Sequence, residues 1–364
     1  MSLEYLKISN FRNLVTVELA PILSGFNFIC GDNGSGKTSL LEAIYYLGLG
    51  RSFRTSSATH IVNHRMDTFL LTGQVNYTDN SYPIGMERHR EGALKIRIHG
   101  KEAKSVAELA QYLPVRLINS SCYLLLEGGP AFRRYYLDWG LFYYADTFFQ
   151  LWKQFNRALK QRNNLLQARC TKAEIDAWSN ELIVYAAGIE MLRREYIKDL
   201  LPYLKEMIVK LVPMGPVEIN YYQGWDEAQP YELVLALTMG QDMRLGRTQN
   251  GPHRADLRLN IQGIPIKDVL SRGQQKLFVC AMIVAQGALL VAQKKRRPIY
   301  LVDDLPSELD VASRSKLITL LSEQNAQIFV TAIESDKAQA FAAQPGLATK
   351  MFHVKHGQIT NMLI

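Results

Sequence analysis

Cysteine is scarce in this chain of 364 residues, and its four cysteines are far apart. Cys30, Cys122, Cys170 and Cys280 show no C-x-x-C spacing. Paired cysteines or a Cys/His cluster would be needed to predict a zinc site from sequence. We therefore expect buried, reduced thiols and no cysteine-bound metal.

A long hydrophobic run is also missing. The most apolar stretch, residues 277–292, is shorter than the ~20 residues that span a bilayer, and Gln286 and Gly287 interrupt it. We expect a buried helix there. The first four residues, Met1 to Glu4, show neither the charged nor the apolar segment of a signal peptide. The expected compartment is the cytoplasm, with no membrane partner.

Charge of one sign is in modest excess, with 42 Lys and Arg against 34 Asp and Glu, a net +8. A basic surface favours polyanions such as nucleic acid or acidic membranes, although many basic proteins bind neither. The apolar content of 48% and charged content of 21% are typical of a soluble globular protein. The length exceeds what one compact core usually holds, so we expect two subdomains.

The most specific pattern is a phosphate-binding loop of the form G-x-x-x-x-G-K-[ST]. Its glycines allow positive φ and a close approach of the backbone to an anion, so that successive N–H groups face phosphate oxygens. Lys37 would supply charge to the β- and γ-phosphates, and the Thr38 hydroxyl is a ligand for Mg²⁺. The predicted nucleotide-binding residues are Gly31, Asp32, Asn33, Gly34, Ser35, Gly36, Lys37, Thr38 and Ser39.

The residues around this loop supply the strand and the helix that it requires. Residues 26–30 predict a short buried strand, and residues 39–49 predict a helix with Leu40, Ile44 and Leu47 on one face. The helix N-terminus adds partial positive charge beneath the phosphates. The alternative is a glycine turn before an ordinary helix, and the complete strand, loop and helix argue against it.

A second pattern supplies carboxylates. Residues 299–302 are apolar and typical of a central parallel strand buried on both faces. Asp303 and Asp304 follow at its carboxyl end, where ligands bind in such sheets. We predict that Asp303 holds Mg²⁺, directly or through water, and that Asp304 orients or deprotonates the attacking water. With Lys37, these aspartates predict a nucleoside triphosphatase in which Lys37 and Asp304 are catalytic.

Periodicity divides the rest of the chain. Alternating residues predict antiparallel strands at 5–8, 15–19, 70–77, 84–88 and 94–99, and further strands at 217–221 and 257–261. Helical spacing dominates from about residue 122 to 212, where Thr171 and Glu174 have the capping-box form. The short connection at 167–172 predicts two antiparallel helices, each about 40 Å long. A projecting hairpin and an ordinary helix pair packed on a globular body fit this pattern equally well.

Two further motifs resemble those of the ABC-type ATPases. Residues 270–276 read LSRGQQK, close to the signature L-S-G-G-Q, and residues 307–310 read SELD, like the D-loop S-x-L-D. In that superfamily the signature of one head reaches the γ-phosphate held by another head, and a hydroxyl with free N–H groups at a helix N-terminus suits an anion. A polar helix N-cap is the alternative for residues 270–276 alone. The resemblance adds Ser271, Arg272, Gly273, Gln274 and Asp310 to the site.

The ordered motifs resemble the RecF family, DNA-repair ATPases related to SMC heads, across nearly the whole chain. The stretches that carry the resemblance are NFRN at 10–13, which includes Arg12, LEAIY at 41–45, GGP at 128–130 with RR at 133–134, LDW at 137–139 and GPHRAD at 251–256. The resemblance implies an α/β fold: an ABC-type ATPase head with a P-loop core and an antiparallel β lobe. The head would comprise residues 1–121 and 213–364, with an inserted helical arm at 122–212.

The same resemblance implies an ATP-dependent homodimer that binds double-stranded DNA near single-strand gaps and acts with RecO and RecR to load RecA. ATP and Mg²⁺ are the implied cofactors. Asp304 stands where the superfamily has a longer glutamate, so we expect weak hydrolysis, with ATP acting mainly as a switch for dimerisation. Arg133, Arg134 and the run at 294–297 are candidate DNA contacts, with solvated surface charge as the alternative.

Three positions differ from the family or superfamily patterns. Asn250 replaces a histidine before Gly251, and residues 117–121 lack the Pro-Glu pair of the glutamine loop, which leaves Asn119 as a candidate metal-site residue. Thr331 stands where transporters have a switch histidine. The ATPase subunit of an ABC transporter is therefore the weaker alternative. A structural SMC-like tether is weaker still, because the helical pair is short.

Overall fold

The computed structural model describes residues 1–77, 80–212, 215–304, 309–332 and 348–362. The chain forms two compact units, Met1–Cys122 with Leu290–Ile364, and Tyr123–Leu289. Residues 215–289 group by their contacts with the helical unit, whereas the expected division assigned them to the head. The reason is local: the strand Asp256–Ile261 packs against the helix Pro130–Tyr144.

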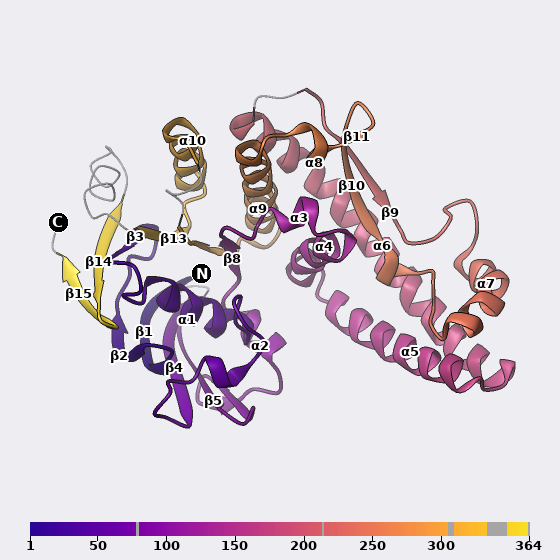
Figure 1. Ribbon diagram of the computed structural model, residues 1–364, viewed down its shortest axis with the longest axis horizontal. Helices are drawn as coiled ribbons and strands as arrows, with labels where there is room; N and C mark the ends of the chain where they lie inside the picture. Colours follow the sequence, from indigo (N-terminus) through magenta and orange to yellow (C-terminus); the bar gives the residue numbers. More distant parts are fainter. Residues whose placement is uncertain (78–79, 213–214, 305–308, 333–347, 363–364) are drawn as a thin grey trace. The chain divides into compact units, whose positions relative to one another are not determined.

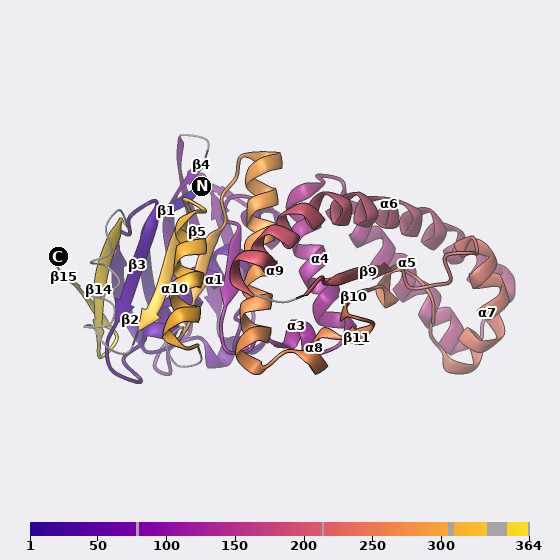
Figure 2. The same cartoon turned by 90° about the horizontal axis from the view of Figure 1, so that it is seen from above.

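The first unit contains a six-stranded sheet of order β15-β14-β3-β13-β12-β8 (Figures 1 and 2). All neighbouring strands pair in parallel except β14 and β15, which are antiparallel. Every residue of β12 and β13 is buried, which explains the continuous apolar sequence of β12. The expected central strand and the helix after the loop are confirmed. The elements are β3 (Gly25–Cys30), β8 (Val115–Ile118), β12 (Ile299–Val302), β13 (Gln327–Ala332), β14 (Thr349–Lys355), β15 (Gln358–Met362), α1 (Lys37–Leu49), α2 (Val106–Ala110) and α10 (Val311–Ser322).

The β lobe of this unit is an antiparallel sheet of order β2-β1-β4-β5-β6-β7. The expected strands are confirmed, and the two predicted at 5–8 and 15–19 extend closer to one another than expected. Phe11 pairs with Leu14, so only Arg12 and Asn13 form the turn, with Arg12 at φ 52°. The strands are β1 (Ser2–Phe11), β2 (Leu14–Leu19), β4 (Thr68–Tyr77), β5 (Asn80–His89), β6 (Leu94–Ile98) and β7 (Lys101–Glu102), and a 3₁₀ turn, η1, covers Ala58–His60.

The second unit is mainly helical and carries the small sheet β11-β10-β9. Helices α5 and α6 lie side by side and antiparallel, as expected (Figure 1). Thr171 and Glu174 form the predicted capping box at the start of α6. The elements are α3 (Leu124–Glu127), α4 (Pro130–Tyr144), α5 (Phe148–Ala168), α6 (Lys172–Leu211), β9 (Glu218–Tyr222), α7 (Tyr231–Leu245), η2 (Pro252–Arg254), β10 (Asp256–Ile261), β11 (Ile264–Pro265), α8 (Ile266–Val269) and α9 (Arg272–Lys294), whose last turn belongs to the first unit.

Helix α6 is longer than predicted. It has 40 residues, which corresponds to about 60 Å at 1.5 Å per residue. Pro202 lies inside it without ending it. Leu200 before the proline and Leu204 and Met207 after it are buried, and this apolar burial outweighs the lost backbone hydrogen bond.

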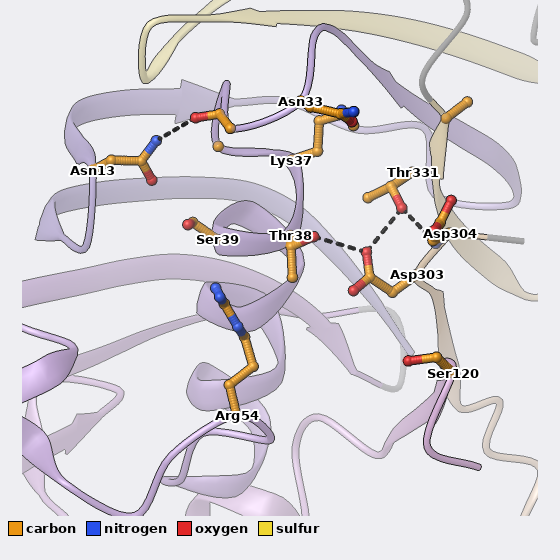
Figure 3. Close-up of a pocket in the computed structure, with 13 residues that line it drawn as sticks. Asn13, Asn33, Lys37, Thr38, Ser39, Arg54, Ser120, Asp303, Asp304 and Thr331 are labelled. Atoms are coloured by element: carbon orange, nitrogen blue, oxygen red, sulfur yellow. Dashed lines mark hydrogen bonds between the residues drawn. The ribbon is translucent and has the colours of Figure 1, made fainter. Parts of the chain in front are cut away.

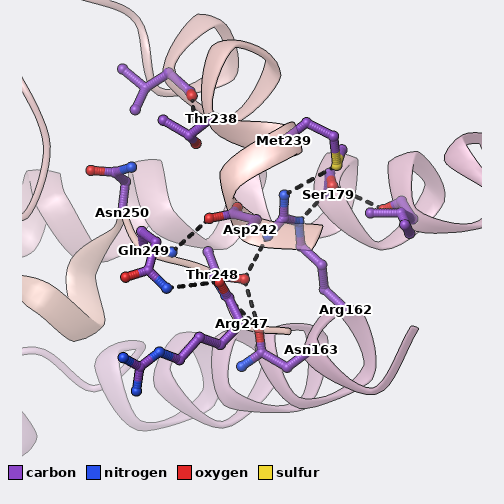
Figure 4. Close-up of polar contacts among 12 residues, drawn as sticks. Arg162, Asn163, Ser179, Thr238, Met239, Asp242, Arg247, Thr248, Gln249 and Asn250 are labelled. Carbon is purple, nitrogen blue, oxygen red and sulfur yellow. Dashed lines mark hydrogen bonds and ion pairs between the residues drawn. The ribbon is translucent and has the colours of Figure 1, made fainter. Parts of the chain in front are cut away.

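A buried ion pair fixes α7 to the α5–α6 pair (Figure 4). Arg162 Nη1 lies 2.8 Å from Asp242 Oδ2, and both side chains are fully buried. The same guanidinium donates to Thr248 Oγ1 at 2.6 Å and to Ser179 Oγ at 2.9 Å. A buried charge is tolerated when its donors are paired in this way. The network therefore specifies where α7 and the segment after it attach.

Helix α9 is the predicted buried apolar helix. Among the described residues it alone has the length and composition to cross a membrane, but 78% of its most apolar window is buried inside the protein. This burial is typical of the core helix of a folded domain. All four cysteines are free, with Cys30 and Cys280 buried and Cys122 and Cys170 partly exposed, so the expectation of burial holds for two of them.

Candidate nucleotide site

The phosphate-binding loop connects β3 to α1 and has the backbone that its glycines predict. Gly36, the N-cap of α1, has φ 119°, and a Cβ added at Gly31 would lie 2.2 Å from the carbonyl oxygen of Val354. Lys37 Nζ donates to the carbonyl oxygens of Gly31 at 2.6 Å and Asp32 at 2.9 Å. Burial lowers the pKa of Lys37. The ammonium group thus rests on its own loop, facing the place where an anion would bind.

The two aspartates lie beside this loop, at the end of β12 (Figure 3). Thr38 Oγ1 donates to Asp303 Oδ1 at 3.1 Å, and Thr331 Oγ1 donates to the same oxygen at 2.9 Å. The backbone N–H of Asp304 donates to Thr331 Oγ1 at 2.8 Å. This bond helps to hold Asp304 in its left-handed conformation, with φ 56°. The structure therefore brings together Lys37, Thr38, both aspartates and Thr331, as the sequence predicted.

The oxygen atoms of Thr38 and Asp303 fit Mg²⁺. Both are hard ligands, and Mg²⁺ in nucleotide sites takes one or two carboxylates and completes its shell with phosphates and water. Among the described residues, no group of three or more His, Cys, Asp or Glu side chains is arranged to hold a metal ion. Burial raises the pKa of Asp303, while the hydrogen bonds from Thr331 and Thr38 oppose that shift. A bound cation would favour the carboxylate further.

A cavity of about 500 Å³ covers these groups. Four of its residues, Asn13, Arg54, Ser120 and Ala332, were not among the predicted site residues. Asn13 reaches the loop by donating to the carbonyl of Gly34 at 3.4 Å, and the signal for it was its place in the NFRN motif. Arg54 comes from the basic segment after α1, and Ser120 follows β8. The lining residues are Asn13, Asn33, Gly34, Gly36, Lys37, Thr38, Ser39, Arg54, Ser120, Asp303, Asp304, Thr331 and Ala332 (Figure 3).

Arg12 lies outside the lining of this cavity. Its guanidinium pairs with the fully buried carboxylate of Glu42, at 2.5 Å from Nε and 2.7 Å from Nη2, and the hydroxyl of Ser52 donates to the same carboxylate. Arg54 Nη1 lies 3.6 Å from Glu42. Arg12 therefore positions Glu42, on α1, behind the loop, while Arg54 links this cluster to the cavity.

Two other predicted residues accept hydrogen bonds from the backbone close to them in the chain. Asn119 Oδ1 accepts the backbone N–H of Ser121 at 3.1 Å, and the neighbouring Ser120 lines the cavity instead. Asp310 caps α10 by accepting the N–H of Ser313 at 2.7 Å. Residues 307 and 308 of the D-loop motif lie outside the described residues. The metal role of Asn119 and the D-loop role of Asp310 stay predictions.

The signature segment belongs to the other unit. Ser271 N–H donates to Gln274 Oε1 at 3.0 Å, and Gln274 N–H donates to Ser271 Oγ at 3.4 Å. This reciprocal pair is a capping box at the start of α9, the alternative noted for these residues. Arg272 pairs with Glu127 at 2.7 Å. Apart from its chain neighbours and the backbone of α9 itself, no atom of the described residues lies within 4 Å of a Cβ built on Gly273. A nucleotide contact by this segment stays a prediction.

Comparison with known proteins identifies the family. The chain matches the model described as RecF/RecN/SMC N terminal domain over residues 2–358. It is 42% identical over 360 residues to DNA replication and repair protein RecF of Shewanella denitrificans, with 99% of each chain covered. It is 43% identical to the RecF of Stutzerimonas stutzeri over 100% of this chain and 98% of that one. The chain belongs to the RecF family.

Solved structures agree with this assignment. A structure of the recombination mediator protein RecF-ATPrS in the RecFOR pathway has a TM-score of 0.87 and 25% identity, covering 99% of this chain and 98% of that one. An SmcHead bound to a domain of ScpA shares the fold, with a TM-score of 0.62 at 14% identity over 100% and 98% of the chains. The α/β ABC-type head is confirmed, and a transporter subunit is not favoured.

The RecF-like motifs outside the nucleotide site form one cluster in the helical unit. Arg133 makes a bidentate ion pair with Asp256, with Nε 2.6 Å from Oδ1 and Nη2 3.0 Å from Oδ2. Arg134 donates to the carbonyl of Ala255 at 2.8 Å. Arg193 joins Asp138 to the carbonyl of Pro252. In this structure the guanidinium groups of Arg133 and Arg134 bind internal acceptors, and a DNA contact by either residue stays a prediction.

Proposed function

We propose that this protein is an ATP-switched clamp of recombinational repair: it binds ATP with Mg²⁺, dimerises, and holds double-stranded DNA. The observation that carries the proposal is the hydrogen bond between Thr38 and Asp303 in a cavity that also contains Lys37. Relatives named for DNA replication and repair, and a structure of the recombination mediator protein RecF-ATP, support it. The expected compartment is the cytoplasm.

Each residue of the cavity has a role in this proposal. Lys37 exchanges its two carbonyl acceptors for phosphate oxygens, which are stronger partners for an ammonium group. Thr38 and Asp303 hold Mg²⁺, and the ion neutralises charge on the phosphates. Asp304 is exposed in the cavity and orients the attacking water. Because its side chain is one methylene shorter than glutamate, hydrolysis is weak and the bound state persists.

Dimerisation uses the signature segment of a second copy. Ser271 and the N-terminus of α9 would complete the site around Lys37 of the partner, with Gly273 allowing close approach. Because the same surfaces meet twice across a two-fold axis, each dimer would bind two ATP molecules. ATP then stabilises the dimer by mass action, and the loss of ATP on hydrolysis lets the dimer dissociate.

DNA binding is carried over from the family resemblance, the basic composition favours it, and its affinity should fall steeply with salt. Lys295 and Arg297 of the run at 294–297 are exposed and stay candidate contacts, whereas Arg296 donates to Gln111 at 3.1 Å. RecO and RecR would act with the clamp at single-strand gaps to load RecA. These partners are carried over from the family and its RecFOR pathway.

The test is the mass of the protein–DNA complex with gapped and with plain duplex DNA, with and without ATP. We expect a dimer on DNA only when ATP is present, and more of it on gapped DNA. ATP-independent monomers on both DNAs would contradict the switch. A dimer that forms with ATP but never retains DNA would contradict the substrate and leave the switch intact.

A further inference from the structure

A second cavity, of about 510 Å³, lies wholly within the helical unit. The end of α3 and the start of α4 form one side of it, and the β10–β11 hairpin with α8 forms the other. Its size is that of a ligand site. None of its residues belongs to the nucleotide site. Its walls are largely apolar, from Leu126, Pro130, Leu259, Pro265 and Ile266.

The charges around this cavity leave a positive excess. Arg133 is neutralised by Asp256, and Glu127 is neutralised by Arg272. Arg258 and Lys267 also line it, both are exposed, and neither forms an ion pair with any carboxylate of the described residues. The guanidinium of Arg258 lies 4.6 Å from the ring centroid of Tyr222, which holds it in place. Two uncompensated cations on an apolar hollow favour an amphipathic anion.

We propose that this cavity docks an acidic peptide segment of a partner protein, with an apolar side chain as its anchor. A carboxylate pair fits Arg258 and Lys267, and the anchor fits the wall between Leu126 and Leu259. Nucleic acid fits less well, because a duplex backbone presents phosphates and sugars without a large apolar side chain to fill the hollow.

The cavity is linked to the signature segment by two direct contacts. Glu127, in its lining, holds Arg272 at 2.7 Å. The carbonyl of Lys267 accepts from Gln275 Nε2 at 2.9 Å, and Gln275 is buried. An occupant therefore touches the residues that hold both flanks of the segment around Gly273. This regulatory part rests on the proposed function, since it matters only if the segment completes an ATP site.

The test is a selection of random peptides displayed on phage against the full-length protein and against the double variant Arg258→Glu/Lys267→Glu. We expect wild-type protein to enrich peptides that combine Asp or Glu with a large apolar residue. A labelled copy of the best peptide, followed by fluorescence anisotropy, should bind the double variant roughly tenfold or more weakly. The matched control Lys95→Glu/Arg97→Glu, which reverses two exposed charges in the β lobe, should bind like wild type.

Equal enrichment on wild-type protein and on the double variant would overturn the site, as would selection of basic or purely apolar peptides. The regulatory part has a separate measurement, the ATP-induced dimer fraction at saturating peptide, where we expect a change of at least about twofold. Peptide binding with an unchanged dimer fraction would overturn regulation and leave the site standing. A protein that binds peptide but never dimerises with ATP would contradict the proposed function only.

Discussion

Thr38 Oγ1 donates to Asp303 Oδ1 across 3.1 Å, although 265 positions separate the two residues in the chain. Thr331 donates to the same carboxylate oxygen, so Asp303 is held from two elements. The parallel pairing of β12 with β13, and of β13 with β3, brings these groups together at the carboxyl ends of the strands. The nucleotide site is thus assembled by the protein itself, which lowers the ordering cost of binding.

Lys37→Met should weaken ATP binding by roughly 10- to 100-fold, because hydrogen bonds to a charged partner contribute about 1.5–3 kcal/mol. ATP-dependent dimers should disappear with it. Calorimetric titration with ATP and light scattering measure the two effects. Lys7→Met is the matched control, since Lys7 forms an exposed ion pair with Glu18 on the β lobe. Unchanged affinity in Lys37→Met would remove the nucleotide assignment.

Asp304→Asn should retain ATP binding, abolish the slow hydrolysis and increase the lifetime of the dimer. The amide keeps the size of the side chain but cannot take a proton from water. The backbone N–H bond to Thr331 is unaffected, so the local fold should survive. Phosphate release and dimer lifetime are the readouts. Hydrolysis at the wild-type rate would show that another group orients the water.

Ser271→Arg should leave ATP binding by the monomer intact and prevent ATP-induced dimers, because the bulky cation replaces a small hydroxyl at the contact with the partner. Loss of the cap with Gln274 costs about 1 kcal/mol, which a folded unit tolerates. Ser271→Thr keeps the hydroxyl and serves as the control. Dimers of normal strength in Ser271→Arg, measured by light scattering, would rule out a role in trans.

Arg162→Met should destabilise the helical unit by about 3–5 kcal/mol, because it leaves the carboxylate of Asp242 buried without its cation. The double variant Arg162→Met/Asp242→Leu should recover much of this loss, since no unpaired charge remains. Urea unfolding measures both free energies. A double variant as unstable as the single one would show that the hydrogen bonds to Thr248 and Ser179 dominate over the ion pair.

Stability should fall as the pH drops from about 7 to 4, in part through His253. Burial lowers the pKa of His253 to about 4, and its Nε2 lies 3.1 Å from the carbonyl oxygen of Thr248. The unfolded chain, with a pKa near 6.5, binds the proton first, so this contribution is complete above pH 6.5 and is lost as the pH falls through 4. Its upper limit is about 3 kcal/mol.

The measurement compares the unfolding free energy of wild-type protein and His253→Gln at pH 7 and pH 5. Glutamine keeps a donor for the carbonyl of Thr248 but has no proton to gain in this range. The difference between the two pH values should be smaller in the variant. Equal pH slopes would mean that His253 is as easily protonated in the folded protein as in the unfolded chain.

Local chemistry made part of this structure predictable. The glycines before Lys37 require a loop, the capping box at Thr171 starts a helix, and the apolar run 299–302 forms a strand buried on both faces. Each depends on neighbours in the sequence, so each could be predicted. The length of α6 could not be predicted in this way, because a proline usually ends a helix. The helix continues past Pro202 only because residues on both sides of it pack against distant parts of the chain.

The amino-acid sequence by itself determined the nucleotide loop, the aspartate pair and the family, since these reside in short runs with their own backbone and charge requirements. Only the tertiary structure decided which side chains face the cavity. It placed Asn13, Arg54 and Ser120 there and assigned Arg12 to Glu42 and Arg133 to Asp256. The reason is physical: where a cation finds its carboxylate depends on how distant elements pack, and spacing along the chain does not encode it.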